Sequence, residues 1–255
     1  MFNQLLICAI GLGLSSLLGS VIGMAVRRIP HKLNDIFLGF CAGMMLAASL
    51  VCLIMPSIEM AGLSGWWQPL IGVVAGVMLV AVLDRITPHL HHIAGVDTSI
   101  EEPHTSRNKS INRVLLFVMA IAIHKFPEGL ATGIVFDGGN MSNAYSVAIT
   151  IALQNIPEGM VVVTPLIMIG SSFGRVLTVS LAIAVLEVAG VMAGYFLGDI
   201  SSAVLPMLTA LAGGAMLYVI SDEMIPETHS HGFEKPATYA LVGGVMLMLY
   251  IQQIV

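Results

Sequence analysis

The chain has 255 residues, of which 57% are hydrophobic and 10% charged, and its mean hydropathy is +0.93. In soluble domains about a quarter of all residues are charged. The lower charged fraction of this chain therefore excludes an ordinary soluble protein. The formal net charge of −5 says little about partners, and we expect membrane lipid and no nucleic acid. We therefore predict an all-α integral membrane protein.

Eight hydrophobic stretches approach or exceed the length of about 20 residues that a helix needs to cross a bilayer. No basic region precedes the first stretch and Arg27 and Arg28 follow it, which favours a retained span over a cleaved signal peptide. The sequence therefore predicts one transmembrane domain of eight helices. Their expected limits are about 4–26, 35–56, 66–84, 114–136, 144–170, 176–197, 203–221 and 236–255.

The basic residues indicate the orientation of these spans. Nine of the ten follow the first, third, fifth and seventh spans, namely Arg27, Arg28, Lys32, Arg85, Arg107, Lys109, Arg113, Arg175 and Lys235. Cytoplasmic loops are enriched in Lys and Arg. We therefore predict that these loops are cytoplasmic and that both termini lie outside the plasma (inner) membrane.

The longest predicted loop, about 86–112, is polar and without hydrophobic periodicity. Histidine-rich tracts bind metal, and a solvated linker is an equally good interpretation of this loop. The end of the seventh span is also rich in acidic and histidine residues, beginning with Asp222. Candidate ligands that would pass an ion to the cytosol are Glu223, Glu227, His229, His231, His89, His91 and His92, with His104 further along the loop.

The fourth span contains His124, Lys125 and Glu128 in an otherwise apolar run. Ionisable groups at a helix centre in the bilayer cost about 2.5–3.5 kcal/mol each by insertion scales, so they face a cavity or a partner. His124 and Glu128 are four residues apart and share a helix face. Pro127 lacks an N–H and clashes with the carbonyl of Ile123, which predicts a kink beside them. This arrangement indicates half of a metal site.

A second copy of this segment follows in the fifth span, because residues 151–159 match residues 121–129 position by position. Gln154, Asn155 and Glu158 stand at the places of His124, Lys125 and Glu128. The short polar link predicts that the two helices run antiparallel, and inverted repeats with broken helices are typical of transporters.

A weaker echo relates the second and seventh spans. Gly43-Met44-Met45-Leu46 with Pro56 resembles Gly214-Ala215-Met216-Leu217 with Pro226, offset by one residue. Together with the first pair of copies, it predicts a 3+2+3 arrangement in which the last three helices mirror the first three.

Several polar side chains are expected near the bilayer midplane when helix centres are taken from the span limits: Met45, His124, Gln154, Glu158 and Glu187, with Glu128 one turn further along. We predict that the glutamates bind a cation, the alternative being neutral carboxylic acids. Other interpretations are a structural hydrogen bond for the histidine, a helix–helix hydrogen bond for the amide and simple packing for the methionine. Glu187 needs a partner on another helix, and Lys125 is the intramembrane cation that the sequence offers.

The eight spans, the histidine-bearing loop and the motifs His-x-Phe-Pro-Glu-Gly (124–129) and Gln-x-Ile-Pro-Glu-Gly (154–159) carry a resemblance. On these features the whole chain resembles the ZIP family of divalent metal transporters. The resemblance implies uptake of zinc and related ions (iron, manganese, cadmium) into the cytoplasm. It also implies a 3+2+3 fold with outward termini, homodimers and a binuclear site at the midplane.

Carried over by motif, the resemblance implies a first metal position formed by His124, Glu128, Gln154 and Glu158, with Met45 as a soft ligand. The second metal position would use Lys125, Asn155 and Glu187, where the family usually has Asn, often Asp, and Glu. Here the three glutamates and one lysine give a net charge of −2, which one divalent ion balances. The sequence therefore predicts one bound ion, with the ammonium of Lys125 in place of the second.

The leading hypothesis is a metal transporter that works by alternating access and is not an enzyme, with zinc as its substrate and no organic cofactor. A membrane metal sensor or structural protein is the alternative. An intramembrane metal hydrolase is a further one, disfavoured because the sequence has no His-Glu-x-x-His. Met and His ligands favour zinc or cadmium over magnesium or calcium.

Overall fold

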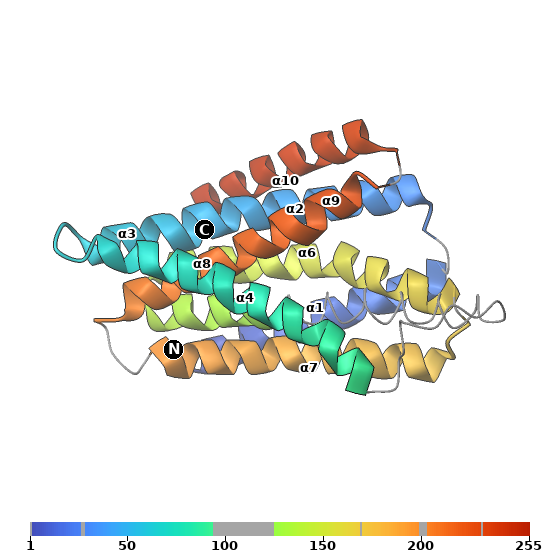
Figure 1. Cartoon of the computed structure of the whole chain (residues 1–255), viewed down its shortest axis with the longest axis horizontal. Coiled ribbons are helices and arrows are strands. Elements are labelled where there is room, and N and C mark those ends of the chain that lie inside the picture. Colours follow the sequence, from blue (N-terminus) through green and yellow to red (C-terminus); the bar gives the residue numbers. More distant parts are fainter. Residues whose placement is uncertain (1, 27–28, 94–124, 169, 199–202, 231) are drawn as a thin grey trace.

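The computed structural model describes residues 2–26, 29–93, 125–168, 170–198, 203–230 and 232–255, and all regular elements in these ranges are helical. Most of the helices run along the long axis of an elongated bundle (Figure 1). In chain order they are α1 (Phe2–Val26), α2 (His31–Ala47), η1 (Ala48–Ile54), α3 (Met55–Ala61), α4 (Trp67–Ile93), a helical segment at 125–137, α6 (Met141–Met168), α7 (Phe173–Gly198), α8 (Leu205–Val219), η2 (Ile220–Met224), α9 (Ile225–Thr228) and α10 (Glu234–Ile254).

Within the described ranges, six stretches of helix are long and apolar enough to cross a membrane, and a shorter apolar helix covers Trp67–Leu83. This is the structure of an integral membrane protein, as the composition predicts. The six stretches are Phe2–Val26, His31–Ala61, Met141–Thr164, Phe173–Gly198, Leu205–Thr228 and Glu234–Ile254. Of the fourth predicted span, 114–136, the structure describes only residues from 125 onward.

Two helices extend beyond the limits expected from the sequence. α4 continues to Ile93, so residues 86–93, which were expected in a loop, are helical. The apolar side chains of Ile86, Leu90 and Ile93 recur at helical spacing, and this periodicity persists after the first charges end the hydrophobic run. The seventh predicted span likewise continues through η2 and α9.

The helices pack in two groups. In one, α2 packs on α10 and α4 packs on α8; in the other, α1 packs on α6 and α7, and the segment 125–137 packs on α7. Small residues allow membrane helices to approach closely, and glycines lie against the partner's backbone in each of these pairs. Examples are Gly43 at Leu241, Gly76 at Leu211, Gly19 at Ile156 and Gly129 at Glu187.

Side chains join the two groups. α2 contacts α6, where the Cys41 thiol donates to the carbonyl oxygen of Gln154 at 3.5 Å. The Thr150 hydroxyl donates to the Met248 sulfur at 2.6 Å. The boundary between the groups is thus bridged by side-chain contacts.

The second and seventh spans share a local distortion. In each, an α-helix passes through a π-helical segment (η1 or η2) into a short α-helix with proline near its start, Pro56 in α3 and Pro226 in α9. A proline ring excludes the carbonyl four residues earlier from the helix ladder. The carbonyl at that distance from Pro56 belongs to Cys52, and it accepts a hydrogen bond from Asn143 Nδ2 at 2.8 Å. The two segments of the sequence echo therefore have the same local structure.

Candidate metal centre

A cluster of polar side chains lies inside the bundle, contributed by three helical segments. Lys125 and Glu128 come from the segment 125–137, and Glu187 comes from α7. α6 contributes Gln154, Asn155 and Glu158. All six are buried, and none is more than 3% exposed.

Lys125 lies at the centre of this cluster. Its Nζ donates to Glu128 Oε2 at 2.7 Å, to Glu158 Oε2 at 2.5 Å and to Asn155 Oδ1 at 2.6 Å. Hydrogen bonds between charged groups are roughly twice as strong as neutral ones. The ammonium thus links the glutamates of both sequence copies, and it occupies the space between them where a bridging cation would bind.

Glu187 is held by neutral side chains, and Lys125 bridges the two inner glutamates, which is one of the two arrangements that the sequence allows. Asn155 Nδ2 donates to Glu187 Oε1 at 2.7 Å while Asn155 Oδ1 accepts from Lys125. The hydroxyl of Ser16 on α1 donates to Glu187 Oε2 at 2.8 Å. Asn155 therefore satisfies a cation on one side and an anion on the other, which an aspartate at this place could not do.

Gln154 lies where α6 meets α2. Gln154 Nε2 donates to Glu128 Oε1 at 3.0 Å, and its buried Oε1 has no hydrogen-bond partner within the described part of the chain. Met45 is buried on α2, one turn after Cys41, which contacts the backbone of Gln154. Residues four apart share a helix face, so Met45 lies on the side of α2 that faces α6.

The glycines of the two motifs explain how these helices approach their partners. A Cβ on Gly129 would collide with the backbone of α7 at Glu187, and a Cβ on Gly159 would lie 2.6 Å from the carbonyl oxygen of Ser16. The motif glycines therefore bring the glutamate-bearing helices against the two residues that complete the cluster.

Sequence reasoning did not identify Ser16 or its neighbour Ser15, whose hydroxyl oxygen lies 3.3 Å from Asn155 Nδ2. Two adjacent hydroxyl residues near the middle of a mostly apolar first span were the available signal. His124 lies outside the described residues, so its place among the ligands remains a prediction.

The candidate exit residues are partly described. Glu223 lies in η2, Glu227 lies in α9, and His229 follows α9 with its Nδ1 2.8 Å from the carbonyl oxygen of Ile225. The backbone positions of three histidines fall in the last turns of α4: His89, His91 and His92. His104 and His231 lie outside the described residues.

The described cluster contains three carboxyl groups and a single ammonium. With Glu128, Glu158 and Glu187 ionised and Lys125 protonated, its net charge is −2, and it is removed from water. Buried charge is costly unless it is compensated. Among the described residues, no three His, Cys, Asp or Glu side chains gather closely enough to hold a metal ion.

An all-helical bundle of apolar spans around a buried, negatively charged cluster defines an integral membrane protein with a polar site in its interior. Residues 84–252 match the family model described as ZIP zinc transporter. The zinc transporter ZIPB of Bordetella bronchiseptica is 37% identical over 240 residues, covering 92% of this chain and 75% of that protein. The chain belongs to the ZIP family.

Two further relatives match over most of both chains. The zinc transporter GufA of Myxococcus xanthus is 35% identical over 252 residues, 96% of each protein. The zinc transporter ZupT of Chlorobaculum parvum is 31% identical over 248 residues, 92% of this chain and 91% of that protein.

Proposed function

We propose that this protein transports divalent transition-metal ions across the membrane into the cytoplasm, with zinc as its principal substrate and cadmium, iron and manganese as further ones. The observation that carries the proposal is the buried cluster in which the glutamates of the two Pro-Glu-Gly motifs, together with Glu187, accompany Lys125, with a net charge of −2 when all four are ionised. Relatives that are 31–37% identical over nearly the whole chain and are named zinc transporters support the same function.

One metal ion binds at the centre. Its proposed ligands are Met45, His124, Glu128, Gln154 and Glu158, and the unpartnered Gln154 Oε1 supports this assignment. Lys125 stands in for a second ion, because its ammonium already bridges the oxygens that such an ion would share. The loaded centre is then neutral, which suits its low-polarity surroundings.

The ion crosses by alternating access, in which the two motif helices move relative to the flanking helices. The tandem copies in 121–129 and 151–159 support this, since inverted repeats are typical of alternating-access transporters. The movement would take place at the boundary between the two helix groups, where the contacts are made by side chains such as Cys41 and Thr150.

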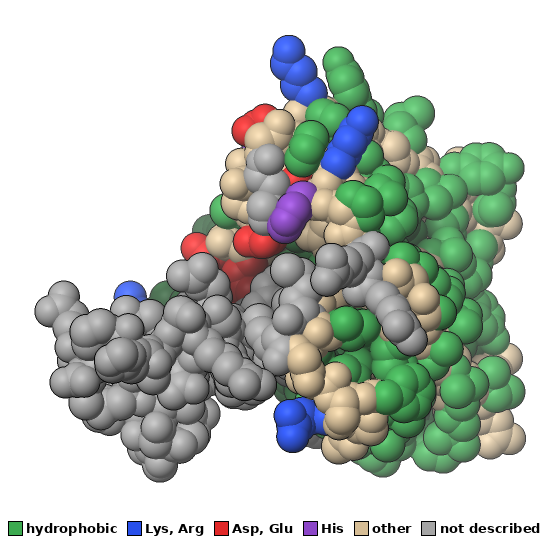
Figure 2. All heavy atoms as spheres, turned by 90° about the vertical axis from the view of Figure 1, so that its right-hand side faces the viewer, with side chains coloured by type: hydrophobic (Ala, Val, Ile, Leu, Met, Phe, Trp, Pro, Cys, Tyr) green, Lys and Arg blue, Asp and Glu red, His purple; other side chains and the backbone are tan. Residues whose placement is uncertain are grey.

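The termini lie outside and the connections at the opposite end face the cytoplasm. Figure 2 looks onto the end of the bundle where α2 and α10 begin, and Lys and Arg side chains project there beside acidic and histidine side chains. Lys32, Arg175 and Lys235 are exposed residues near the starts of α2, α7 and α10 respectively. Their placement follows the enrichment of basic residues in cytoplasmic loops. The homodimer that the family resemblance implies belongs to the same proposal.

Uptake of radioactive zinc into sealed vesicles, compared between the wild type and Glu128→Ala, tests the function. The wild type should accumulate zinc and the variant should not, while Lys235→Ala, an exposed substitution, should leave uptake unchanged. A wild type that binds zinc without accumulating it would favour a sensor over a transporter.

A further inference from the structure

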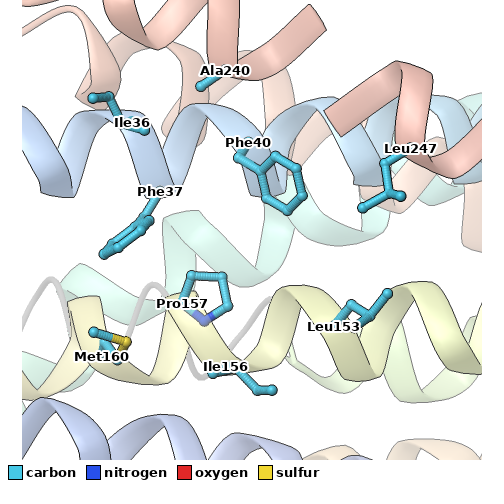
Figure 3. Close-up of a pocket in the computed structure, with 9 residues that line it drawn as sticks. All are labelled: Ile36, Phe37, Phe40, Leu153, Ile156, Pro157, Met160, Ala240 and Leu247. Carbon is cyan, nitrogen blue, oxygen red and sulfur yellow. The ribbon is translucent and has the colours of Figure 1, made fainter. Parts of the chain in front are cut away.

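An apolar crevice of about 470 Å³ lies between α6 and the pair formed by α2 and α10. In Figure 3, side chains of α2 and α10 line it on one side and side chains of α6 line it on the other. All nine lining residues are apolar: Ile36, Phe37, Phe40, Leu153, Ile156, Pro157, Met160, Ala240 and Leu247. The crevice thus lies on the boundary between the two helix groups.

The side chains at this boundary explain why space remains here. α2 lies against α10 at Gly43, where the backbones meet. Towards α6, by contrast, α2 presents the rings of Phe37 and Phe40, and α6 presents Leu153. Bulky side chains hold the helices apart, and the crevice opens between them at the level of the Pro157 ring.

The position in the membrane identifies what fills the crevice. Its lining belongs to three candidate membrane spans, so the surrounding medium is the hydrocarbon of the bilayer. A water molecule needs two to four polar partners, and the lining side chains supply none. An empty space would forfeit the dispersion contacts of its walls. We propose that the acyl chain of a membrane lipid occupies this crevice.

The lipid packs against the back of the metal centre. Ile156 and Pro157 line the crevice, while Asn155 and Glu158, on the same turn of α6, bond to Lys125. The next step rests on the proposed function, in which α6 moves along α2 and α10. The crevice then changes shape during each cycle, and its contents must yield. An acyl chain can leave and return, whereas a fixed side chain cannot. The lipid is therefore a movable packing element that governs the rate of transport and leaves metal affinity unchanged.

The experiment uses the whole protein in proteoliposomes made with a phospholipid that carries a photoreactive group in its acyl chain. Ala240→Phe places a ring in the crevice. Val242→Phe is the matched control, because Val242 lies on the same helix and is 52% exposed on its lipid-facing side. Mass spectrometry of the cross-linked peptides should show several-fold less labelling of residues 153–160 in Ala240→Phe, and wild-type labelling in Val242→Phe.

Zinc uptake and zinc binding are measured on the same samples. Ala240→Phe should slow zinc uptake several-fold and leave the zinc affinity unchanged. Val242→Phe should change neither the rate of uptake nor the zinc affinity. Retained zinc binding shows that Ala240→Phe is folded. If this variant does not fold, Leu247→Phe replaces it, because it introduces a ring into the crevice from another position on α10. Equal labelling in both variants, or even labelling of every lipid-facing helix in the wild type, would overturn the lipid site. Unchanged uptake despite lost labelling would overturn its effect on rate. A labelled wild type that takes up no zinc would instead refute the proposed function and leave the site supported.

Discussion

Combining Lys125→Asn with Asn155→Asp should raise the number of zinc ions bound per protomer from one to two. The first change removes the ammonium that links Glu128 to Glu158, and the second supplies a carboxylate beside Glu187. Together they change the net charge of the buried cluster from −2 to −4. Two divalent ions would then balance it, as one does in the wild type.

The distances in the cluster give the size of the effect. Lys125 Nζ lies 2.7 Å from Glu128 Oε2 and 2.5 Å from Glu158 Oε2. Zinc binds carboxylate oxygens at about 2.0–2.2 Å, so an ion on either atom would lie within about 5 Å of the ammonium. At an effective dielectric constant of about 20, a single and a double charge repel at this separation by about 7 kcal/mol. The three carboxylates offset this repulsion for one divalent ion, because the charges then sum to zero, and they do not offset it for a second.

The assay is metal content per protomer, measured by anomalous diffraction and by calorimetric titration of purified protein. Lys235→Asn serves as control, because it removes one positive charge from an exposed position and should leave one ion bound. The single change Lys125→Asn should give an intermediate result, because the cluster then has a charge of −3 and still lacks the fourth carboxylate. Two well-occupied ions in the wild type, or one in the double variant, would refute the reasoning.

Three further tests use substitutions at the glutamates, at Ser16 and at the histidines. Glu128→Ala or Glu158→Ala should abolish zinc uptake without unfolding the protein, and uptake above half of the wild-type rate in either variant would contradict the ligand assignment. Ser16→Ala should lower the free energy of unfolding by about 1–3 kcal/mol, because it leaves a buried oxygen of Glu187 without its donor. Thermal unfolding measures this change. Ser20→Ala is the control, because the Ser20 hydroxyl bonds within α1. Removing four histidines together should change the apparent zinc affinity of uptake only modestly, whereas complete loss would place their segment in the permeation path: His89, His91, His92 and His104.

Hydropathy predicted most helix positions because a membrane span must be apolar along its whole length. It failed where a helix leaves the bilayer. α4 continues to Ile93 beyond the charged residues that end the hydrophobic run, since a helix may extend into water without losing its backbone hydrogen bonds. The helical continuation of the seventh span through α9, beyond its predicted limit at residue 221, was not predicted for the same reason.

The buried cluster was predictable in its charged members and in the two amides of the repeated motif, and not in the serines of α1. Lys125, Glu128 and Glu158 stand out because ionisable groups in an apolar run are expensive. Ser16 carries no such signal, because a serine in a membrane helix can bond to its own backbone, as Ser20 does. Which serine reaches Glu187 depends on how closely α1 approaches α6 and α7, and that spacing is set by glycines on three helices.

The π-helical segments explain the one-residue offset between the two copies of the sequence echo. One residue more separates Gly43 from Pro56 than separates Gly214 from Pro226. η1 has seven residues and η2 has five, while the α-helical stretch from the glycine to the start of the π-helical segment is one residue longer in the seventh span than in the second, so the net difference is one residue. Each copy therefore keeps its glycine and its proline at equivalent places along the helix.

Such a widened turn is a place where chain length can vary during evolution at little cost. In a regular α-helix, one inserted residue rotates everything after it by about 100°, since a turn contains 3.6 residues. The insertion would turn the face of α3 away from its neighbours. A π turn absorbs the extra residue locally, so the register of the packed faces before and after it is preserved. Homologous chains should accordingly differ by single-residue insertions and deletions at Ala48–Ile54 and Ile220–Met224, and alignments of the two halves of this fold should place their gaps there.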